Sequence, residues 1–396
     1  MGLPLEGLIV VEVSSFVAGP AMGALFHDLG AHVIKVEQPV TGDPSRSVSP
    51  WGFLNYNLGK ESLSLNLKSD IGEEILHRLI STKKVDIFIE NMGPHVSNRL
   101  GFSYPVLRKL NPDLIYCSIK GFSRGSKFFD RPAFDAVAQA MSGMMSLTGE
   151  PNGEPVRVGN PSIDLGAAAY GTIKVLSALL ERPKTKRGKF IEISLLDMSV
   201  YWNGYWLTYF GLTNHVPQRQ GTGHAGYSPH KVFTTKDNKR VLIATLSDPQ
   251  WKKLSTLLKI RLGSSYDEMK YRIIHRTEVE RAIQIAVSEL NSDELLERLS
   301  STVPSAKVRS IDEVYNDREL EDFGVLEDAV NPFDSDKKKE NIVRVVRSPI
   351  SSRKRNGKKL SPALSVPKLG QDNEKILKSI GYKAKEIQTF KQLGIV

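Results

Sequence analysis

Two periods of hydrophobic spacing alternate along the first half of the chain. Residues 8–13 are a short β-branched run with little polar alternation, typical of a strand covered on both faces. A helix follows, with Pro20 in its first turn and Gly30 just past its end, the positions that these residue types favour. Residues 33–37 form the next strand. The pattern predicts a βαβ unit whose two strands are parallel.

The same alternation continues to about residue 200. Segments with strand spacing are followed by segments with helical spacing, an order that indicates a doubly wound α/β fold. The predicted strands cover residues 62–67, 85–90, 114–119 and 189–194, and the predicted helices cover 71–79, 104–110, 134–147, 164–182 and a segment from Leu195.

The pattern changes near residue 212. Residues 211–229 are rich in Gly, Pro, Asn and Gln and are typical of a connection, and a β-hairpin is predicted over 231–244. We therefore expect a large domain built from residues 1–212 and 326–396 and a smaller α+β domain built from 222–325. Further predicted helices cover about 248–258, 276–289, 292–300, 372–381 and 384–393.

The composition is that of a folded protein with an excess of positive charge. Of the 396 residues, 40% are hydrophobic and 25% are charged, and the formal net charge is +10. That charge suits an anionic ligand. No apolar run is long enough to cross a bilayer, and the N-terminus lacks the pattern of a signal peptide. We therefore expect a cytoplasmic location without a membrane partner.

The positive charge is concentrated in three runs, at residues 182–189, 337–339 and 353–359. These runs carry almost no aromatic residues for stacking on bases, and solvated loops explain them. A basic nucleic-acid-binding protein that uses residues 353–359 is an alternative of another class. It predicts an affinity that falls steeply with salt.

Cysteine and histidine usage argues against several kinds of site. Cys117 is the only cysteine, which excludes an intrachain disulfide and a thiolate zinc cluster, and its place in a predicted strand favours inert packing. The eight histidines form no HxH or HxxxH pair, so no metal site is predicted. No covalently bound cofactor is predicted either.

The first βα turn tests for a dinucleotide site. Residues 17–23 do not match GxGxxG, and Pro20 lacks the backbone donor that a pyrophosphate needs. Only Glu37, at the end of the second predicted strand, fits a ribose-binding acid. The chain also lacks GxxxxGK[ST] and GxSxG, so neither a P-loop nor a serine-hydrolase elbow is supported.

Asp164 stands where an extended, turn-rich segment gives way to a helix of small and apolar residues. Such a carboxylate has two interpretations. It is either a helix N-cap that accepts backbone N–H groups, or a nucleophile whose small neighbours let a bulky electrophile approach. Position alone favours the cap.

Several short motifs occur in a fixed order along the chain. In order and spacing they resemble the class III coenzyme A-transferase family, which includes formyl-CoA and carnitine CoA-transferases and the α-methylacyl-CoA racemases. The likeness covers nearly the whole chain, and the ordered set carries it rather than any one motif. The motifs are Gly19-Pro20, Val36-Glu37 with Gly42-Asp43, residues 57–68, residues 90–94, Arg99-Leu100-Gly101, residues 131–135, Asp164 and residues 187–194.

The resemblance implies a Rossmann-like large domain built from both chain ends, a smaller middle domain and an interlocked homodimer. It also implies that Asp164 attacks an acyl-CoA thioester to give a mixed anhydride and then an aspartyl-CoA thioester, from which a small carboxylic acid takes the CoA. A thiolate leaves readily, so the weakly nucleophilic carboxylate suffices. We expect the helix N-terminus to favour the ionised form of Asp164, and Gly166, Ala167 and Ala168 to leave room for the thioester.

The resemblance also places coenzyme A contacts on residues that match the family's positions. Val17 and Ala18 correspond to the thioester end, and Gln38 to the adenine end. Gln38 stands where formyl-CoA enzymes carry an arginine, so adenine binding is expected to differ. Val17 replaces a glutamine of those enzymes, which argues against oxalate or formate as substrate. The other implied contacts are Leu65, Asn66, Leu67, Lys68, Asn91, Met92, Gly93, Arg99, Arg131, Phe134 and Asp135.

An acyl-CoA racemase is the closest alternative. Racemases of this family use a His–Asp pair and a further Asp as acid and base at the α-carbon. The histidine would precede Asp135, but Phe134 stands there and carries no titratable group. The residues therefore favour transfer over racemisation, while Asp135 alone also fits an ordinary acid in a first helix turn.

A glycine-rich loop at residues 220–230 opens the predicted small domain. In the formyl-CoA branch a glycine-rich loop near this position covers the active aspartate, and Gly221, Gly223 and Gly226 would allow such motion. A plain interdomain linker is equally compatible. His224 is the histidine best placed to reach the site, and no role is assigned to it.

Overall fold

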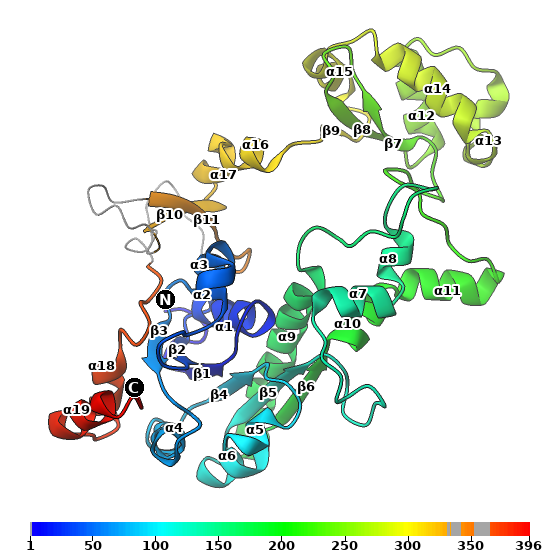
Figure 1. The fold of residues 1–396 in the computed structure, drawn as a ribbon. Helices are drawn as coiled ribbons and strands as arrows, with labels where there is room; N and C mark the ends of the chain where they lie inside the picture. Colours follow the sequence, from blue (N-terminus) through cyan, green and yellow to red (C-terminus); the bar gives the residue numbers. More distant parts are fainter. Residues whose placement is uncertain (1, 331–332, 334–341, 352–364) are drawn as a thin grey trace. The chain divides into compact units, whose positions relative to one another are not determined.

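The computed structural model describes residues 2–330, 333, 342–351 and 365–396 (Figure 1). The basic runs at 337–339 and 353–359 lie outside the described residues. The chain divides into two compact units. The first comprises Met1–Met144, Val158–Leu207 and Asp317–Val396, and the second comprises Met145–Arg157 and Thr208–Asn316. The boundaries differ from the expected ones chiefly at Met145–Arg157, which groups with the second unit.

A six-stranded parallel sheet forms the centre of the first unit. Its strands run in the order β3-β2-β1-β4-β5-β6, and every neighbouring pair is parallel. This is the strand order of a doubly wound α/β fold, which confirms the expected fold class. The strands are β1 (Ile9–Val13), β2 (His32–Glu37), β3 (Glu61–Ser64), β4 (Ile87–Glu90), β5 (Ile115–Lys120) and β6 (Phe190–Ser194).

Each face of the sheet has its own core, because successive strand residues point to opposite faces. In β1, Val11 packs into one core and Val10 into the other. Helices cover both faces (Figure 1). The first core is completed by α4 (Asp70–Thr82), α6 (Tyr104–Leu110), α18 (Asn373–Ser379) and α19 (Ala384–Gln392), and the second by α1 (Ala18–Asp28), α7 (Asp135–Met141) and α9 (Ser162–Thr185).

Cys117 lies in the second core and is fully buried. Burial, together with the nearby charge of Glu90, raises the pKa of its thiol to about 12. A thiol that stays protonated is a poor nucleophile. Inert packing, as predicted for this residue, is confirmed.

The C-terminal helices complete the first unit. The amide of Ser64 donates to Asn373 Oδ1 at 2.8 Å, and the amide of Asn66 donates to the carbonyl of Ile395 at 2.8 Å. Both bonds attach the end of the chain to the segment at and just after the edge strand β3. The two chain ends therefore build one unit.

Helix α9 corrects one expectation from the sequence. Its 24 residues are long and apolar enough to cross a bilayer by length and composition, so the statement that no apolar run reaches this length is wrong. A core helix passes the same test, and α9 packs Ile163, Ala167 and Val175 into the second core. Its apolar composition follows from that packing.

The small residues of α9 serve helix packing, contrary to the expectation that they leave room for substrate. Ala167 and Ala168 are buried in the core. A Cβ at Gly166 would lie 2.7 Å from the ring of Trp202 in α10 (Leu195–Trp202), and a Cβ at Gly171 would lie 3.1 Å from the sulfur of Met22 in α1. The missing side chains let α10 and α1 approach α9 closely.

The second unit contains a small antiparallel sheet. The predicted hairpin is confirmed as β7 (His230–Thr234) and β8 (Arg240–Ala244), and the short strand β9 (Ser305–Lys307), which was not predicted, pairs with β8. One core joins this sheet to its helices. The remaining elements of this core region are α12 (Asp248–Leu257), a 3₁₀ turn η1 (Ser264–Asp267), α13 (Met269–Ile274), α14 (Arg276–Val287) and α15 (Ser292–Leu299).

Most of the elements that the hydrophobic pattern missed are short, because a few turns carry too few apolar repeats to show a period. The helix predicted over 134–147 is interrupted at Gly143, whose φ of +85° separates α7 from α8. The other short elements are α2 (Ser45–Val48), α3 (Pro50–Asn57), α5 (Val96–Arg99), α8 (Met144–Leu147), α11 (Gly204–Thr213), α16 (Ile311–Tyr315), α17 (Arg318–Asp322), β10 (Leu326–Val330) and β11 (Ile342–Val346).

The close packing of α9 on α10 gives a stability prediction. Gly166→Ala is expected to destabilise the protein by about 1–3 kcal/mol, because the added methyl group overlaps Trp202. Gly52→Ala in α3 is the matched control, since its Cβ would meet nothing closer than 3.4 Å and alanine favours a helix. Urea denaturation followed by circular dichroism measures both. Equal midpoints for the two variants would contradict the packing argument.

Candidate active site at the carboxyl edge of the sheet

The residues that the resemblance assigns to coenzyme A in the first unit share one topological position. Each lies in a segment that follows the carboxyl end of a strand. In open parallel sheets, ligands bind outside this edge, at the point where the strand order reverses. Here the reversal lies between β1 and β4. Val17 and Ala18 follow β1, Gln38 follows β2, residues 65–68 follow β3, residues 91–93 and Arg99 follow β4, and residues 131–135 follow β5.

Helices α1 and α9 both begin at this edge. Helix α1 follows β1 directly. Helix α9 ends at the opposite edge, because Arg182 pairs with Asp86 at 2.8 Å just before β4, and the amide of Gly188 donates to the carbonyl of Pro112 at 2.8 Å just before β5. Asp164, in the first turn of α9, is therefore placed at the edge where ligands bind.

Asp164 is not the N-cap of its helix. The helix begins at Ser162, the N-cap position is occupied by Pro161, and Pro161 makes no side-chain cap. The carboxylate of Asp135 takes over the capping from α7. Its Oδ2 accepts the amides of Ile163 at 2.7 Å and of Asp164 at 3.2 Å. The capping interpretation of Asp164 is thus wrong, and the side chain of Asp164 is left for another role.

Asp135 is itself held from behind. Gln139, one turn further along α7 and fully buried, donates its side-chain amide to Asp135 Oδ1. The oxygen of the same Gln139 side chain accepts the amide of Val158 at 3.0 Å, in the segment that leads to α9. A chain of hydrogen bonds therefore fixes the start of α9 relative to α7. Asp135 was predicted at the site from the motif at residues 131–135, whereas nothing in the sequence pattern indicated a role for Gln139.

The electrostatics around Asp164 correct a second expectation. Burial, followed by the charge of Asp135, raises the pKa of Asp164 to about 7. The helix N-terminus was expected to favour the ionised form, but desolvation and a neighbouring like charge outweigh it. Burial and then the charge of Asp164 raise the pKa of the partly buried phenol of Tyr56 in α3. Asp164 is thus more basic, and a stronger nucleophile when ionised, than an ordinary aspartate.

Phe134 occupies the position before Asp135 and is 64% exposed. A phenylalanine side chain has no group that could exchange a proton with a substrate beside Asp164. The arrangement therefore offers two carboxylates and no histidine at this position for proton transfer at an α-carbon.

A reciprocal pair of hydrogen bonds joins the loops that follow β1 and β4. The amide of Ser15 donates to Asn91 Oδ1 at 2.9 Å, and Asn91 Nδ2 donates to the carbonyl of Ser15 at 2.8 Å. Asn91 thereby connects the loop before Val17 to the loop of Met92 and Gly93. The structure brings these predicted residues to one place.

The remaining predicted contacts are spread along the same edge. Gln38, Lys68, Arg99 and Arg131 are all exposed, as an anion-binding surface requires, and the Arg131 guanidinium lies 4.8 Å from the ring centre of Phe128. Leu65 differs, because its side chain is buried in the first core and leaves only its backbone for a ligand. Asn66 and Leu67 are half-buried.

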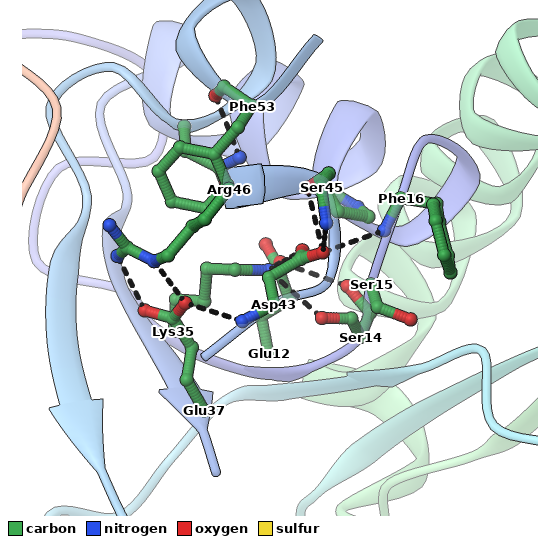
Figure 2. Close-up of polar contacts among 12 residues, drawn as sticks. Glu12, Ser14, Ser15, Phe16, Lys35, Glu37, Asp43, Ser45, Arg46 and Phe53 are labelled. Atoms are coloured by element: carbon green, nitrogen blue, oxygen red, sulfur yellow. Dashed lines mark hydrogen bonds and ion pairs between the residues drawn. The ribbon is translucent and has the colours of Figure 1, made fainter. Parts of the chain in front are cut away.

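A buried cluster of charges lies directly behind the β1–α1 loop (Figure 2). Lys35 Nζ contacts Glu12 Oε1 at 2.9 Å and Asp43 Oδ2 at 3.0 Å, and Lys60 Nζ contacts Glu12 Oε2 at 2.7 Å. Arg46 pairs with Glu37 at 2.7 Å beside them. Three carboxylates and three cations balance, and sequence reasoning missed the set. The signal was present as charged residues inside otherwise apolar strands.

Mutual attraction overcomes desolvation for most of this cluster. Burial alone would raise the pKa values of Glu12 and Asp43, but the neighbouring lysine charges lower both below their usual range. Burial would lower the pKa of Lys35, but Glu12 and Asp43 raise it. Lys60 is the exception, because burial and the charge of Lys35 leave its pKa at about 8. The set is stable as ions only when it is complete.

The predicted substrate loop belongs to the second unit. Arg276 at the start of α14 donates to the side chain of Gln220 at 3.2 Å and to the carbonyl of Ala225 at 2.9 Å. The amide of Gly226 donates to Nδ1 of His224 at 3.0 Å, and burial followed by the charge of Arg276 lowers the pKa of that histidine. Gly221 has a φ of +56°, which favours glycine. Gly223 lies between these anchored residues.

Comparison with known proteins identifies the family. The family model described as "CoA-transferase family III" matches residues 5–373. Succinate–glutarate CoA-transferase of Agrobacterium fabrum is 31% identical over 94% of this chain and 95% of its own. Acetyl-CoA:oxalate CoA-transferase of Acetobacter aceti is 33% identical over 72% of this chain and 75% of its own.

A solved structure has the same architecture. The CAIB/BAIF family protein from Brucella suis superposes with a TM-score of 0.81 at 28% identity, covering 96% of this chain and all of its own. The span that the family model matches, residues 5–373, contains all six strands of the parallel sheet and the segments that follow them. The chain therefore belongs to CoA-transferase family III and is an enzyme that transfers coenzyme A.

Proposed function

We propose that the enzyme moves coenzyme A from an acyl-CoA to a carboxylic acid through covalent intermediates on Asp164. One observation carries the proposal. A carboxylate whose pKa is raised to about 7 stands in the first turn of α9, at the ligand-binding edge of the sheet. Its role as a helix cap has been taken over by Asp135.

The first half of the reaction loads the enzyme. Asp164 Oδ attacks the thioester carbonyl carbon, the C–S bond breaks, and the CoA thiolate departs with the electron pair, leaving a mixed anhydride. The thiolate then attacks the aspartyl carbonyl of that anhydride and releases the donor acid as its carboxylate. The enzyme now holds CoA as an aspartyl thioester. Splitting the transfer in this way replaces one difficult step by easier ones.

The second half repeats the same chemistry in reverse. The acceptor carboxylate attacks the aspartyl thioester, expels the CoA thiolate and forms a second mixed anhydride. The thiolate then attacks the acceptor's acyl carbon, which frees Asp164 as a carboxylate. No proton is gained or lost overall, so no general acid is needed.

The backbone at the start of α1 supports the charge that develops on the thioester oxygen. The first amides of a helix have no partner within it. In α1 the N-cap residue Val17 makes no side-chain cap, and among the described residues no hydrogen bond to the amides of Ala18 and Gly19 is present. Unpaired amides beside an acyl carbon are the donors that an oxyanion requires.

The chemistry of the relatives suggests the substrates. The Agrobacterium relative is named for succinate and glutarate and the Acetobacter relative for oxalate, all of them dicarboxylic acids. Val17 stands where formyl-CoA enzymes carry glutamine, which argues against the shortest acids. We therefore favour succinyl-CoA as the donor and a dicarboxylic acid such as glutarate as the acceptor. The net charge of +10 suits such anions.

An interlocked homodimer is part of the same proposal. Helix α11 has no buried residue, although it is composed of aromatic and aliphatic side chains. Tyr205, Leu207 and Leu212 are each more than half exposed. An apolar surface of this kind on a soluble protein is typical of an interface. A second copy of the chain is the occupant that the family resemblance implies.

The mechanism predicts a covalent adduct on Asp164. With succinyl-CoA and glutarate the wild type should form glutaryl-CoA, and with succinyl-CoA and hydroxylamine it should yield a hydroxamate on the peptide that holds Asp164. Asp164→Asn should lower transfer by about three orders of magnitude or more, because the amide cannot attack. Mass spectrometry follows both products.

Asp197→Asn is the matched control, because Asp197 is also an acid in a first helix turn, that of α10. It should retain transfer. If Asp164→Asn transferred coenzyme A at the wild-type rate, the assignment of Asp164 as the nucleophile would be refuted. If the enzyme exchanged the α-proton of a 2-methylacyl-CoA without an acceptor acid, the racemase alternative would be favoured.

The raised pKa predicts the pH dependence. Asp164 attacks as a carboxylate, so kcat/KM for the acyl-CoA should rise with pH through about 7. Asp135→Asn keeps an oxygen for the amides of Ile163 and Asp164 but removes the like charge, so the midpoint should move to lower pH. Burial is the larger cause and remains, so the shift should be partial. An unchanged midpoint in Asp135→Asn would show that its charge plays no part.

The exposed apolar helix predicts the oligomeric state. Tyr205→Asp should convert the dimer to a monomer or to aggregates, because a charge on α11 would be buried at the interface. Ile274→Asp on α13 is the control, since Ile274 is an isolated exposed residue and should leave the dimer intact. Light scattering after size exclusion measures both masses. A monomeric wild type would contradict the proposal.

A further inference from the structure

The β1–α1 loop contains a residue in an unusual conformation. Phe16 has a φ of +63°, in the left-handed region that residues other than glycine seldom adopt. Its side chain is 47% exposed and lies outside the buried cores, so side-chain packing does not impose this conformation. Contacts to the backbone must impose it instead.

Side chains from β2 and from the segments that follow β2 and β4 hold the residues of this loop, and Figure 2 shows those of Lys35 and Asp43. The carbonyl of Ser14 accepts from Lys35 Nζ at 2.9 Å. Ser15 makes its two hydrogen bonds with Asn91. The amide of Phe16 donates to Asp43 Oδ1 at 3.2 Å. The last bond acts directly on the residue with positive φ.

Asp43 is firmly placed for this task. It is 3% exposed, and the same Oδ1 accepts the amide and the hydroxyl of Ser45 at 2.9 and 2.7 Å. Its Oδ2 contacts Lys35 at 3.0 Å, and its own amide donates to Glu37 at 3.0 Å. The amide and both carboxylate oxygens of Asp43 therefore each contact a polar group of the protein itself.

The turn at Phe16 sets the direction in which α1 begins. The next residues, Val17 and Ala18, supply the thioester end of the site in the proposed function. The backbone of Gly19 packs closely on the side chain of Ser14, because a Cβ at Gly19 would lie 2.3 Å from Ser14 Cβ. The loop therefore has little freedom to shift. A rotation at Phe16 would therefore turn the amides of α1 away from the acyl group without unfolding the helix.

We propose that Asp43 is a positioning residue for coenzyme A transfer, which holds Phe16 in the left-handed conformation and so aims the first amides of α1 at the thioester oxygen. The inference rests on the proposed function, in which Asp164 attacks that thioester. Asp43 touches no substrate itself. It acts through the backbone of Phe16.

Asp43→Asn tests the role, because Oδ1 of the carboxylate accepts from Phe16 and Ser45 while Oδ2 lies 3.0 Å from the Lys35 ammonium, and an amide has only one oxygen. Asparagine can serve either Phe16 and Ser45 or Lys35, but not both sides. We expect kcat to fall at least tenfold while KM for succinyl-CoA changes less than threefold.

Asp86→Asn is the matched control at the opposite edge of the same sheet. Asp86 also accepts a backbone amide, that of Ile9 at 2.9 Å, and a cation, Arg182 at 2.8 Å. It should lower thermal stability in the same way as Asp43→Asn and leave kcat unchanged. A loss of kcat in both variants would mean that destabilisation alone explains the effect.

A rescue experiment separates positioning from folding. Glycine adopts positive φ without an external bond, so Phe16→Gly added to Asp43→Asn should restore kcat at least fivefold without restoring thermal stability. Phe16→Val in the otherwise native chain should lower kcat more than Phe16→Gly, because a β-branched residue resists this conformation. This second comparison remains decisive if Asp43→Asn does not fold.

The readout is the single-turnover rate of adduct formation on Asp164, measured by quenched-flow mass spectrometry. A wild type that forms no adduct would overturn the proposed function. A wild type that forms the adduct, with Asp43→Asn forming it equally fast, would overturn the positioning role alone. Equal rates for Phe16→Val and Phe16→Gly would overturn it as well.

Discussion

The proposed active site depends on the hydrogen bonds between the Asp135 carboxylate and the amides that begin α9. Those bonds tie two helices together across a segment of chain that belongs to the other unit. They also put two carboxylates next to one another in a poorly hydrated place. The residue that anchors the start of α9 is therefore also the residue whose charge perturbs Asp164.

Two opposing effects therefore set the pKa of Asp164. A helix start attracts negative charge, worth about 0.3–1 kcal/mol at a surface, but here Asp135 already occupies two of the amides that would provide this attraction. Burial then dominates, and the pKa rises to about 7. A more basic carboxylate is a better nucleophile but is less often ionised. A pKa near the working pH balances these two effects.

Much of the fold and part of the site could be predicted from the sequence. The alternation of strand and helix periods predicted the parallel sheet, because β1, β2 and β5 are buried on both faces and are mostly apolar. Asp164 and Asp135 were found through motifs. Their contact could not be, because 29 residues and several turns separate them. The Glu12–Lys35 pair is similar, since the two residues become neighbours only through the register of β1 on β2.

The two helices that carry the proposed site, α1 and α9, are each anchored by a buried aspartate, but at different positions relative to the helix start. In α9 the buried Asp135 bonds to the amides of the helix itself, so those amides are occupied and Asp164, the proposed nucleophile, is fixed. In α1 the buried Asp43 bonds one residue before the N-cap, to Phe16, so the helix amides stay free. A carboxylate placed on the amides of α1 would compete with the thioester oxygen for the same donors. Because Asp43 bonds to Phe16, one residue before the N-cap, this competition does not arise. The cost is the left-handed conformation of Phe16, which is why the anchor belongs to a buried and fully paired charge cluster rather than to a surface side chain.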